Sequence, residues 1–168
     1  LAWFGHEFRA ADARLITGDT VNVHRFVAQQ RGFSHDDVMA MIEEQYKILR
    51  GIVPIHRELQ ASGHIEVSTT PMFHPILPLL IDTDHACVDR PGTSLPIRFA
   101  HPEDAAAQIA LATEDYTARF GRGPAGMWPA EAAVSIEAVE MIWRDGITWL
   151  ATDAGVLARS GQWGYRTS

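Results

Sequence analysis

The spacing of apolar residues along the chain predicts three helices, of which the first is the clearest. Ser34 followed by Asp37 has the form of a capping box, so we expect a helix to begin there. Apolar residues then recur every three to four positions, as on a helix with one buried face: Val38, Met41, Ile42, Leu49, Ile52, Val53 and Leu59. We expect Pro54 to kink or restart this helix, and Ser62 and Gly63 to end it.

Two further helices are predicted in the second half of the chain. The second begins with Pro102 in its first turn and ends near Gly121. Its predicted inward face consists of Ile109, Ala112, Tyr116 and Phe120. The third is capped by Ser135 and ends at Gly146. Its predicted inward face consists of Ile136, Val139 and Trp143.

Alternating apolar and polar residues with β-branched side chains predict a strand at residues 65–69. Further strands are predicted at residues 126–128 and 148–152, and a fourth near Trp3 is left open. Residues 1–32 otherwise have the pattern of loops with a short helix, and prolines in segment 71–81 predict a buried loop or short helix. The alternation of helices and strands is that of βα units, which predicts an α/β fold with parallel strands and outer helices. A closed barrel of this type needs about eight units and ~250 residues, so this sequence can form only part of one.

Composition and charge narrow the class of protein. The sequence has 168 residues, of which 46% are hydrophobic and 21% charged, as expected for one globular domain. With 14 Lys and Arg against 21 Asp and Glu, its formal net charge of −7 argues against nucleic acid and anionic membranes as partners. It contains no apolar stretch long enough to span a membrane. Cys87 is its single cysteine and no apolar leader opens it, which predicts a cytoplasmic location.

Candidate chemical groups follow the predicted strands, where ligands bind in parallel α/β folds. His74 follows the first strand, Trp128 ends the second and Glu131 follows it, and Asp153 follows the third. Glu131 stands just beyond a Trp-Pro step, where we expect its carboxylate to be rigid and poorly solvated, as a nucleophile or proton-transfer group requires. The ring of Trp128 offers an apolar platform for a sugar face.

Each of these residues also has a purely structural interpretation. Glu131 is consistent with a place at the N-terminus of the helix that Ser135 caps. His74 is consistent with a hydrogen-bonded core histidine, and Asp153 with a turn carboxylate before Gly155. The spacing of the residues leaves these alternatives open.

Eight histidines raise the question of a metal site, but no two of them are three or four residues apart. Asp82, Asp84 and His85 form one compact group, which is either a cation site or a solvated turn. The sequence contains no phosphate-binding loop, dinucleotide fingerprint or serine nucleophile elbow. We therefore expect neither a bound metal nor a cofactor.

Two segments resemble a known family. Residues 65–80 (IEVSTTPMFHPILPLL) resemble the second sequence region of glycoside hydrolase family 57, and residues 126–135 (GMWPAEAAVS) resemble its third. Segments 1–4, 31–34 and 149–157 are similar to the α-amylase/α-mannosidase-like branch of that family. The resemblance therefore covers nearly the whole chain.

This resemblance implies part of an incomplete (β/α)₇ barrel and retaining hydrolysis of α-linked glucans or related α-glycosides. By position, Glu131 would be the nucleophile, His74 and Trp128 would line the sugar subsite, and Asp153 would be a nearby polar residue. The resemblance also implies that the Asp acid/base lies C-terminal to this sequence and the first His-containing strand N-terminal to Leu1. We expect residues 1–168 to be one partial catalytic domain, truncated at both ends and inactive alone. An oligo- or polysaccharide is its expected partner, and the oligomeric state is not predicted.

The sequence departs from this family branch on both sides of the glutamate. Ala130 stands where the branch has Ser, and Ala132 where it has Gly. The first change removes a hydrogen-bonding group, and the second matters only if the backbone there needs a positive φ. Two other functions stay open: a non-catalytic carbohydrate-binding module, and a metal-dependent deacetylase or mannosidase of related barrel form.

Overall fold

The computed structural model describes residues 1–159 and divides the chain into two compact units, Leu1–Glu66 and Val67–Ser168. Each unit is considered by itself. That residues 1–168 make up one truncated catalytic domain stays a prediction, and its expected end at Ser168 lies outside the described residues. No helix in the described part of the chain is long and apolar enough to cross a membrane.

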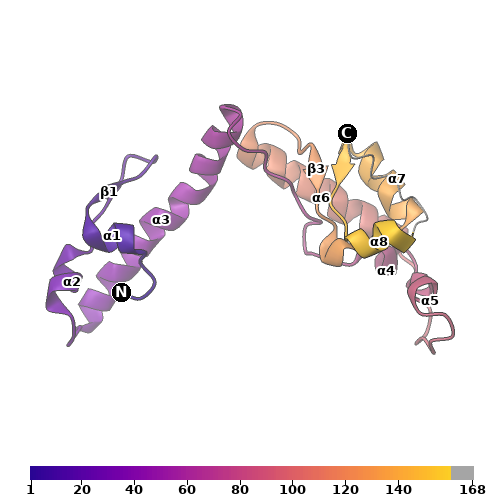
Figure 1. Ribbon diagram of the computed structural model, residues 1–168, viewed down its shortest axis with the longest axis horizontal. Coiled ribbons are helices and arrows are strands. Elements are labelled where there is room, and N and C mark those ends of the chain that lie inside the picture. Colours follow the sequence, from indigo (N-terminus) through magenta and orange to yellow (C-terminus); the bar gives the residue numbers. More distant parts are fainter. Residues whose placement is uncertain (160–168) are drawn as a thin grey trace. The chain divides into compact units, whose positions relative to one another are not determined.

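The first unit consists of short elements beside one long helix (Figure 1). Its elements are α1 (His6–Ala10), β1 (Ala13–Arg14), β2 (Thr20–Val21), α2 (His24–Gln29) and α3 (His35–Ala61). β1 and β2 form an antiparallel pair. Trp3 lies in an exposed turn, so the open question of a strand there is answered in the negative. The buried core of this unit consists of Phe4, Val21, Val23, Phe26 and Met41.

Helix α3 begins where the sequence predicts, because its first turn is closed locally. The Ser34 hydroxyl accepts a hydrogen bond from the Asp37 amide at 3.1 Å, and the Asp37 carboxylate accepts one from the Ser34 amide at 3.0 Å. The bond from the Ser34 amide, together with one from the Ser34 hydroxyl to the same carboxylate, lowers the pKa of Asp37. The helix does not restart at Pro54, because α3 continues through this residue. Proline has a helical φ and removes one backbone hydrogen bond, which a helix with many flanking turns can tolerate.

The predicted burial of the α3 apolar face is also wrong for much of its length. Met41 is buried, but Val38, Leu49 and Ile52 are exposed. The small core of the first unit contacts Ala40, Met41 and Ile48, all in the first half of the helix. Periodicity indicates that a face is apolar, but the neighbouring elements decide how much of that face is covered.

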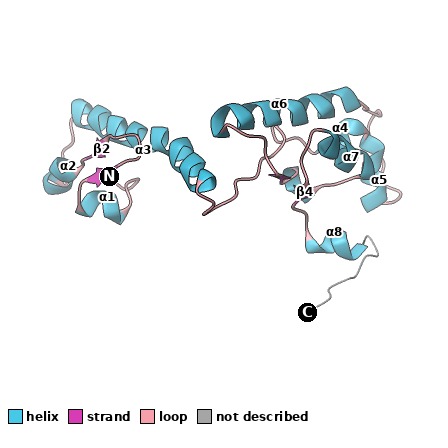
Figure 2. Cartoon of the chain, turned by 90° about the horizontal axis from the view of Figure 1, so that it is seen from above, coloured by secondary structure: helices cyan, strands magenta, loops and turns pink. Residues whose placement is uncertain are grey.

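The second unit is mostly helical (Figure 2). Its α-helices are α4 (Leu77–Ile81), α5 (Ala86–Asp89), α6 (Pro102–Phe120), α7 (Ile136–Arg144) and α8 (Ala154–Arg159). Its other elements are the 3₁₀ turns η1 (Thr83–His85) and η2 (Ala130–Ala132), and the strands β3 (Gly126–Met127) and β4 (Trp149–Leu150). α4 confirms the buried short helix expected within residues 71–81.

The strands of this unit are parallel, as the sequence predicts, but they are shorter. β3 pairs with β4 through Gly126 with Trp149 and Met127 with Leu150. The predicted strand at 65–69 is reduced to one parallel bridge between Thr69 and Met127. Only Thr69 of that segment exchanges backbone hydrogen bonds with the β3 segment, which explains why no longer ladder forms there. The fold is mixed α/β, and the described residues do not close a barrel.

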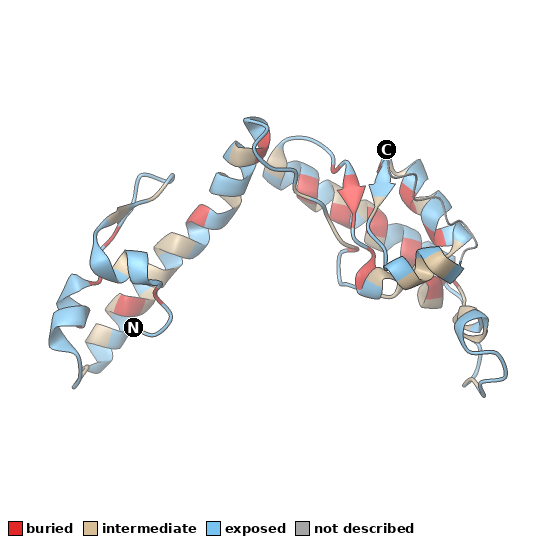
Figure 3. Cartoon of the chain, in the orientation of Figure 1, coloured by how far each residue is buried: buried red, intermediate tan, exposed pale blue. Residues whose placement is uncertain are grey.

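The core of this unit lies between α4, α6, α7 and β3 (Figure 3). It consists of Leu77, Ile81, Ala105, Ile109, Met127, Ala138, Ile142 and Ile147. α6 has the predicted proline in its first turn and ends at Gly121, whose φ is 76°. The Trp149 ring packs directly against Gly126. A Cβ atom at position 126 would lie 1.9 Å from an indole carbon, so only glycine fits there.

Helix α7 presents a different face from the one predicted. The Ser135 hydroxyl caps it as expected, accepting from the Ala138 amide at 3.2 Å. The predicted inward residues are exposed, however: Ile136, Val139 and Trp143. Ala138 and Ile142 are buried instead. The predicted face and the buried face of α7 are both apolar. Periodicity therefore does not distinguish them, and packing of the small Ala138 against the core selects the buried face.

Candidate functional site

Three parallel segments of the second unit end side by side: the segment that contains Thr69, strand β3 and strand β4. The Trp128 amide donates to the Thr69 carbonyl at 2.8 Å, and the Ala151 amide donates to the Met127 carbonyl at 3.0 Å. Because the three segments run in parallel, the residues that follow them emerge from the same edge. These following turns contain His74, Glu131 and Asp153.

His74 lies in a tight turn with a left-handed backbone, since its φ is 56°. Its amide donates to the Pro71 carbonyl at 2.9 Å, which closes the turn. Its Nδ1 lies 3.0 Å from the Thr70 hydroxyl. The His74 side chain is 46% exposed, so it is not the core histidine that the sequence allowed as an alternative.

Glu131 lies in the 3₁₀ turn η2, and it too has a left-handed backbone. The φ of Glu131 is 55° and that of Ala132 is 54°. Each left-handed residue other than glycine costs roughly 1–2 kcal/mol, and such strain is concentrated at functional sites. The change from Gly to Ala at position 132 therefore falls where the backbone does need a positive φ.

The carboxylate of Glu131 faces His74. Glu131 Oε1 lies 3.9 Å from His74 Nε2. The predicted poor solvation of this carboxylate is wrong, because its side chain is 72% exposed and no described element covers it. The alternative in which Glu131 serves the N-terminus of α7 does not hold either. Ser135 caps that helix, and Glu131 belongs to a separate turn before it.

Trp128 completes this group. Its ring is edge-on to the His74 ring, with centroids 6.1 Å apart and planes at 69°. Trp128 is 51% exposed, so part of the indole is open to solvent. The structure therefore brings together three of the four predicted site residues, and it leaves an aromatic surface beside an imidazole and a carboxylate.

Asp153 is the fourth predicted residue, and it belongs to a different local structure. Its Oδ1 accepts a hydrogen bond from the Gly155 amide at 2.6 Å, and its carbonyl accepts one from the Val156 amide at 3.0 Å. Asp153 thus stands at the start of α8 as a turn carboxylate. Among residues 1–159, no hydrogen bond or ion pair joins it to His74, Trp128 or Glu131.

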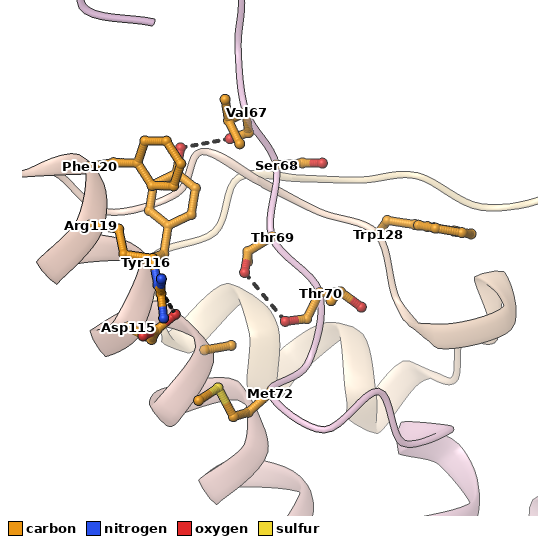
Figure 4. Close-up of a pocket in the computed structure, with 11 residues that line it drawn as sticks. Val67, Ser68, Thr69, Thr70, Met72, Asp115, Tyr116, Arg119, Phe120 and Trp128 are labelled. Carbon is orange, nitrogen blue, oxygen red and sulfur yellow. Dashed lines mark hydrogen bonds and ion pairs between the residues drawn. The ribbon is translucent and has the colours of Figure 1, made fainter. Parts of the chain in front are cut away.

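A cavity of about 360 Å³ adjoins the group (Figure 4). Trp128 and Thr70 line it together with the C-terminal half of α6. Figure 4 shows Tyr116 and Phe120 on the other side of segment 67–70 from Trp128. The Tyr116 hydroxyl donates to the Val67 carbonyl at 2.7 Å, and the two α6 rings stack with centroids 4.5 Å apart. Glu131 and His74 do not line this cavity.

The compact acidic group at residues 82–85 is held by an arginine. Arg98 contacts the carboxylates of both Asp82 and Asp84. Its hydrogen bond to Asp82, together with one from the Asp84 amide, lowers the pKa of Asp82 to about 2. His85 lies 3.5 Å from a carboxylate oxygen of Glu137. Within the described part of the chain, no group of three or more His, Cys, Asp or Glu residues could hold a metal ion.

Two threonines of the site were not predicted from the sequence. Thr70 contacts the His74 ring, and the Thr152 hydroxyl donates to the Ala132 carbonyl at 2.8 Å. Thr70 follows a predicted strand and Thr152 ends one, which is a weak signal. The second contact joins residues 20 positions apart, which a local pattern does not reveal.

Residues 5–165 match the sequence model of glycosyl hydrolase family 57. The chain therefore belongs to that family, which confirms the resemblance and implies glycoside hydrolase activity on a carbohydrate substrate. No curated protein and no solved structure matches the chain.

Proposed function

We propose that this chain supplies the nucleophile of a retaining glycosidase that acts on α-linked glucans or related α-glycosides. The nucleophile is Glu131. One observation carries the proposal: the Glu131 carboxylate lies 3.9 Å from the His74 ring, which also contacts the half-exposed ring of Trp128. These side chains follow parallel strand segments in a chain of a glycosyl hydrolase family, where a sugar-binding group is expected.

The reaction takes two steps in this proposal. A Glu131 carboxylate oxygen attacks the anomeric carbon, the bond from that carbon to the leaving oxygen breaks, and an acid protonates the leaving oxygen. Water then attacks the glycosyl-enzyme and gives up a proton to the same residue, now acting as base. In retaining enzymes this second carboxyl group lies ~5–5.5 Å from the nucleophile.

His74 and Trp128 bind the sugar in this proposal. Thr70 engages Nδ1 of His74, so Nε2 is the ring atom that is directed toward Glu131 and a bound sugar. The exposed indole of Trp128 offers an apolar surface to the hydrogens on one sugar face. Asp153 is proposed as a polar residue at the edge of the site.

The variant Glu131→Gln in the full-length protein tests the proposal, because it keeps the shape of the side chain and removes its charge. We expect turnover of α-glycosides to fall by several orders of magnitude while sugar affinity and thermal stability stay the same. Glu140→Gln is the matched control, since Glu140 is an exposed glutamate of the same unit that is paired with Arg144. Unchanged turnover in Glu131→Gln would rule out the nucleophile role.

A non-catalytic carbohydrate-binding module is the second candidate. The exposure of Glu131 and Trp128 favours it, because an open carboxylate and an open indole suit sugar binding without any chemical step. The two candidates give different results in the native full-length protein. A module binds oligosaccharides without turning them over, whereas an enzyme hydrolyses them.

A further inference from the structure

We infer that Thr152 is a positioning residue, whose hydroxyl holds the left-handed turn that presents Glu131. The inference rests on the proposed role of Glu131 as nucleophile. Its basis is one long-range contact: Thr152 Oγ1 donates a hydrogen bond to the Ala132 carbonyl at 2.8 Å. Thr152 does not touch Glu131 and acts on it through the backbone of Ala132.

The turn at residues 129–133 has a strained backbone, which its two local hydrogen bonds alone do not account for. Glu131 and Ala132 both have a positive φ, which amino acids other than glycine adopt rarely in succession. Two local hydrogen bonds close the turn, from the Ala132 amide to the Pro129 carbonyl and from the Ala133 amide to the Ala130 carbonyl. Strained backbone persists where its surroundings determine it. In the described part of the chain, the Thr152 hydroxyl is the one group of a distant segment that donates a hydrogen bond to the backbone of this turn.

The location of Thr152 makes it a rigid support. It follows β4 by two residues, and the Ala151 amide before it donates to the Met127 carbonyl of β3 at 3.0 Å. The hydroxyl of Thr152 therefore extends the pairing of β3 and β4 to the turn beyond β3. A nucleophile that is displaced by about 1 Å can lose a factor of about 10² in rate, so this support bears on turnover.

Thr148, at the other end of β4, provides a matched control. It precedes β4, is exposed like Thr152, and its hydroxyl donates to the Ala125 carbonyl at 3.0 Å. Both threonines thus connect an end of β4 to the chain around β3. Only the Thr152 bond reaches the turn that contains Glu131, so replacing each threonine by valine separates positioning from simple support of the strand pair.

The test compares Thr152→Val, Thr152→Ser and Thr148→Val in the full-length protein, with α-glucosyl fluoride and α-galactosyl fluoride as substrates. We expect Thr152→Val to lower kcat for fluoride release roughly 10- to 100-fold with KM within about twofold of the native value. Thr152→Ser, which keeps the hydroxyl, should restore kcat to within about threefold, and Thr148→Val should leave it within about twofold. Equal kcat values for the two valine variants, or no restoration by serine, would overturn the inference.

Hydrogen–deuterium exchange gives a readout that does not depend on activity. We expect the amides of residues 130–133 to exchange faster in Thr152→Val than in Thr148→Val, and equal exchange would also overturn the inference. If Thr152→Val does not fold, Thr152→Ala is measured in its place, since it removes the hydroxyl without adding bulk. The proposed function fails separately: if Glu131→Gln keeps full turnover, Glu131 is not the nucleophile, whatever Thr152 does to the turn.

Discussion

His74 and Glu131 come from two turns that follow neighbouring parallel segments, and both residues have a left-handed backbone. Their φ values are 56° and 55°, and His74 Nε2 lies 3.9 Å from Glu131 Oε1. An exposed pair of this kind contributes only about 0–1 kcal/mol to stability. The two strained turns are therefore better explained by function than by stability.

Replacing His74 should reduce activity without destabilising the fold. His74→Asn is the suitable variant, because asparagine tolerates a positive φ and lacks the imidazole. We expect turnover of α-glycosides to fall roughly 100-fold, the order of magnitude for one lost hydrogen-bond donor at a reacting centre. Thermal unfolding should show little change. His56→Asn on the exposed part of α3 is the control, and equal turnover in the two variants would count against a role of His74 in the site.

Ala132→Gly should stabilise the protein, because glycine adopts a positive φ at no steric cost. The relief of left-handed strain exceeds the added entropy of the unfolded chain, so we expect the free energy of unfolding to rise by roughly 0.5–1 kcal/mol. Ala133→Gly is the control, since the φ of Ala133 is −78° and the same change should lower the free energy by a similar amount. Denaturant titration measures both, and a destabilising Ala132→Gly would contradict the strained geometry.

The helix boundaries could be predicted from the sequence because they depend on local contacts. Ser34 and Ser135 cap α3 and α7 through amides three residues away, and Gly121 ends α6 with its positive φ. The buried face of α7 could not be predicted, because Trp143 and Ile142 are both apolar neighbours and only packing against the core distinguishes them. Strand lengths depend on pairing with distant segments, which explains why all three strands were predicted too long.

The candidate site was also predictable only where it depends on the local sequence pattern. Strand ends indicated where His74, Trp128 and Glu131 would meet, and the family match agrees with the motifs that contain them. The exposure of Glu131 was not predictable, because it depends on which elements cover the turn. The hydroxyl contact of Thr152 depends on the approach of two loops and has no local signature.

Trp128 should contribute to sugar binding independently of catalysis. We expect Trp128→Ala to weaken the affinity for maltotriose roughly tenfold, the effect of losing an aromatic contact of about 1.4 kcal/mol. Trp143→Ala is the matched control, because Trp143 is an exposed tryptophan of α7, 65% accessible, outside the site. Titration calorimetry measures both affinities. If both variants bind maltotriose like the native protein, Trp128 is not part of the sugar subsite.

The Asp82–Arg98 pair should make stability depend on acid. The pKa of Asp82 is lowered to about 2 by its hydrogen bond from Arg98, whereas a free aspartate has a pKa of about 3.9. Between these two pKa values the unfolded chain binds more protons than the folded protein. The stabilisation from the pair is therefore complete above the unfolded-state pKa of about 3.9 and is lost as pH falls through the folded-state pKa of about 2.

Two variants check this prediction through melting temperatures measured from pH 6 to pH 2. Asp82→Asn and Arg98→Gln should each be less stable than the native protein at pH 6. Each should also lose less stability on acidification, because Asp82→Asn removes the carboxyl group that titrates and Arg98→Gln removes its charged partner. If Asp82→Asn loses as much stability as the native protein over this range, the pair does not control the acid response.

Trapping of the covalent intermediate tests the central claim most directly. A fluorinated α-glycosyl fluoride that forms the glycosyl-enzyme faster than it is hydrolysed is incubated with the full-length protein, in gluco and galacto forms, and the labelled peptide is identified by mass spectrometry. We predict one sugar per chain, attached to the Glu131 carboxylate, and no label in Glu131→Gln. A label on any other residue, or turnover of α-glycosides by a protein in which Glu131 is never labelled, would contradict the account.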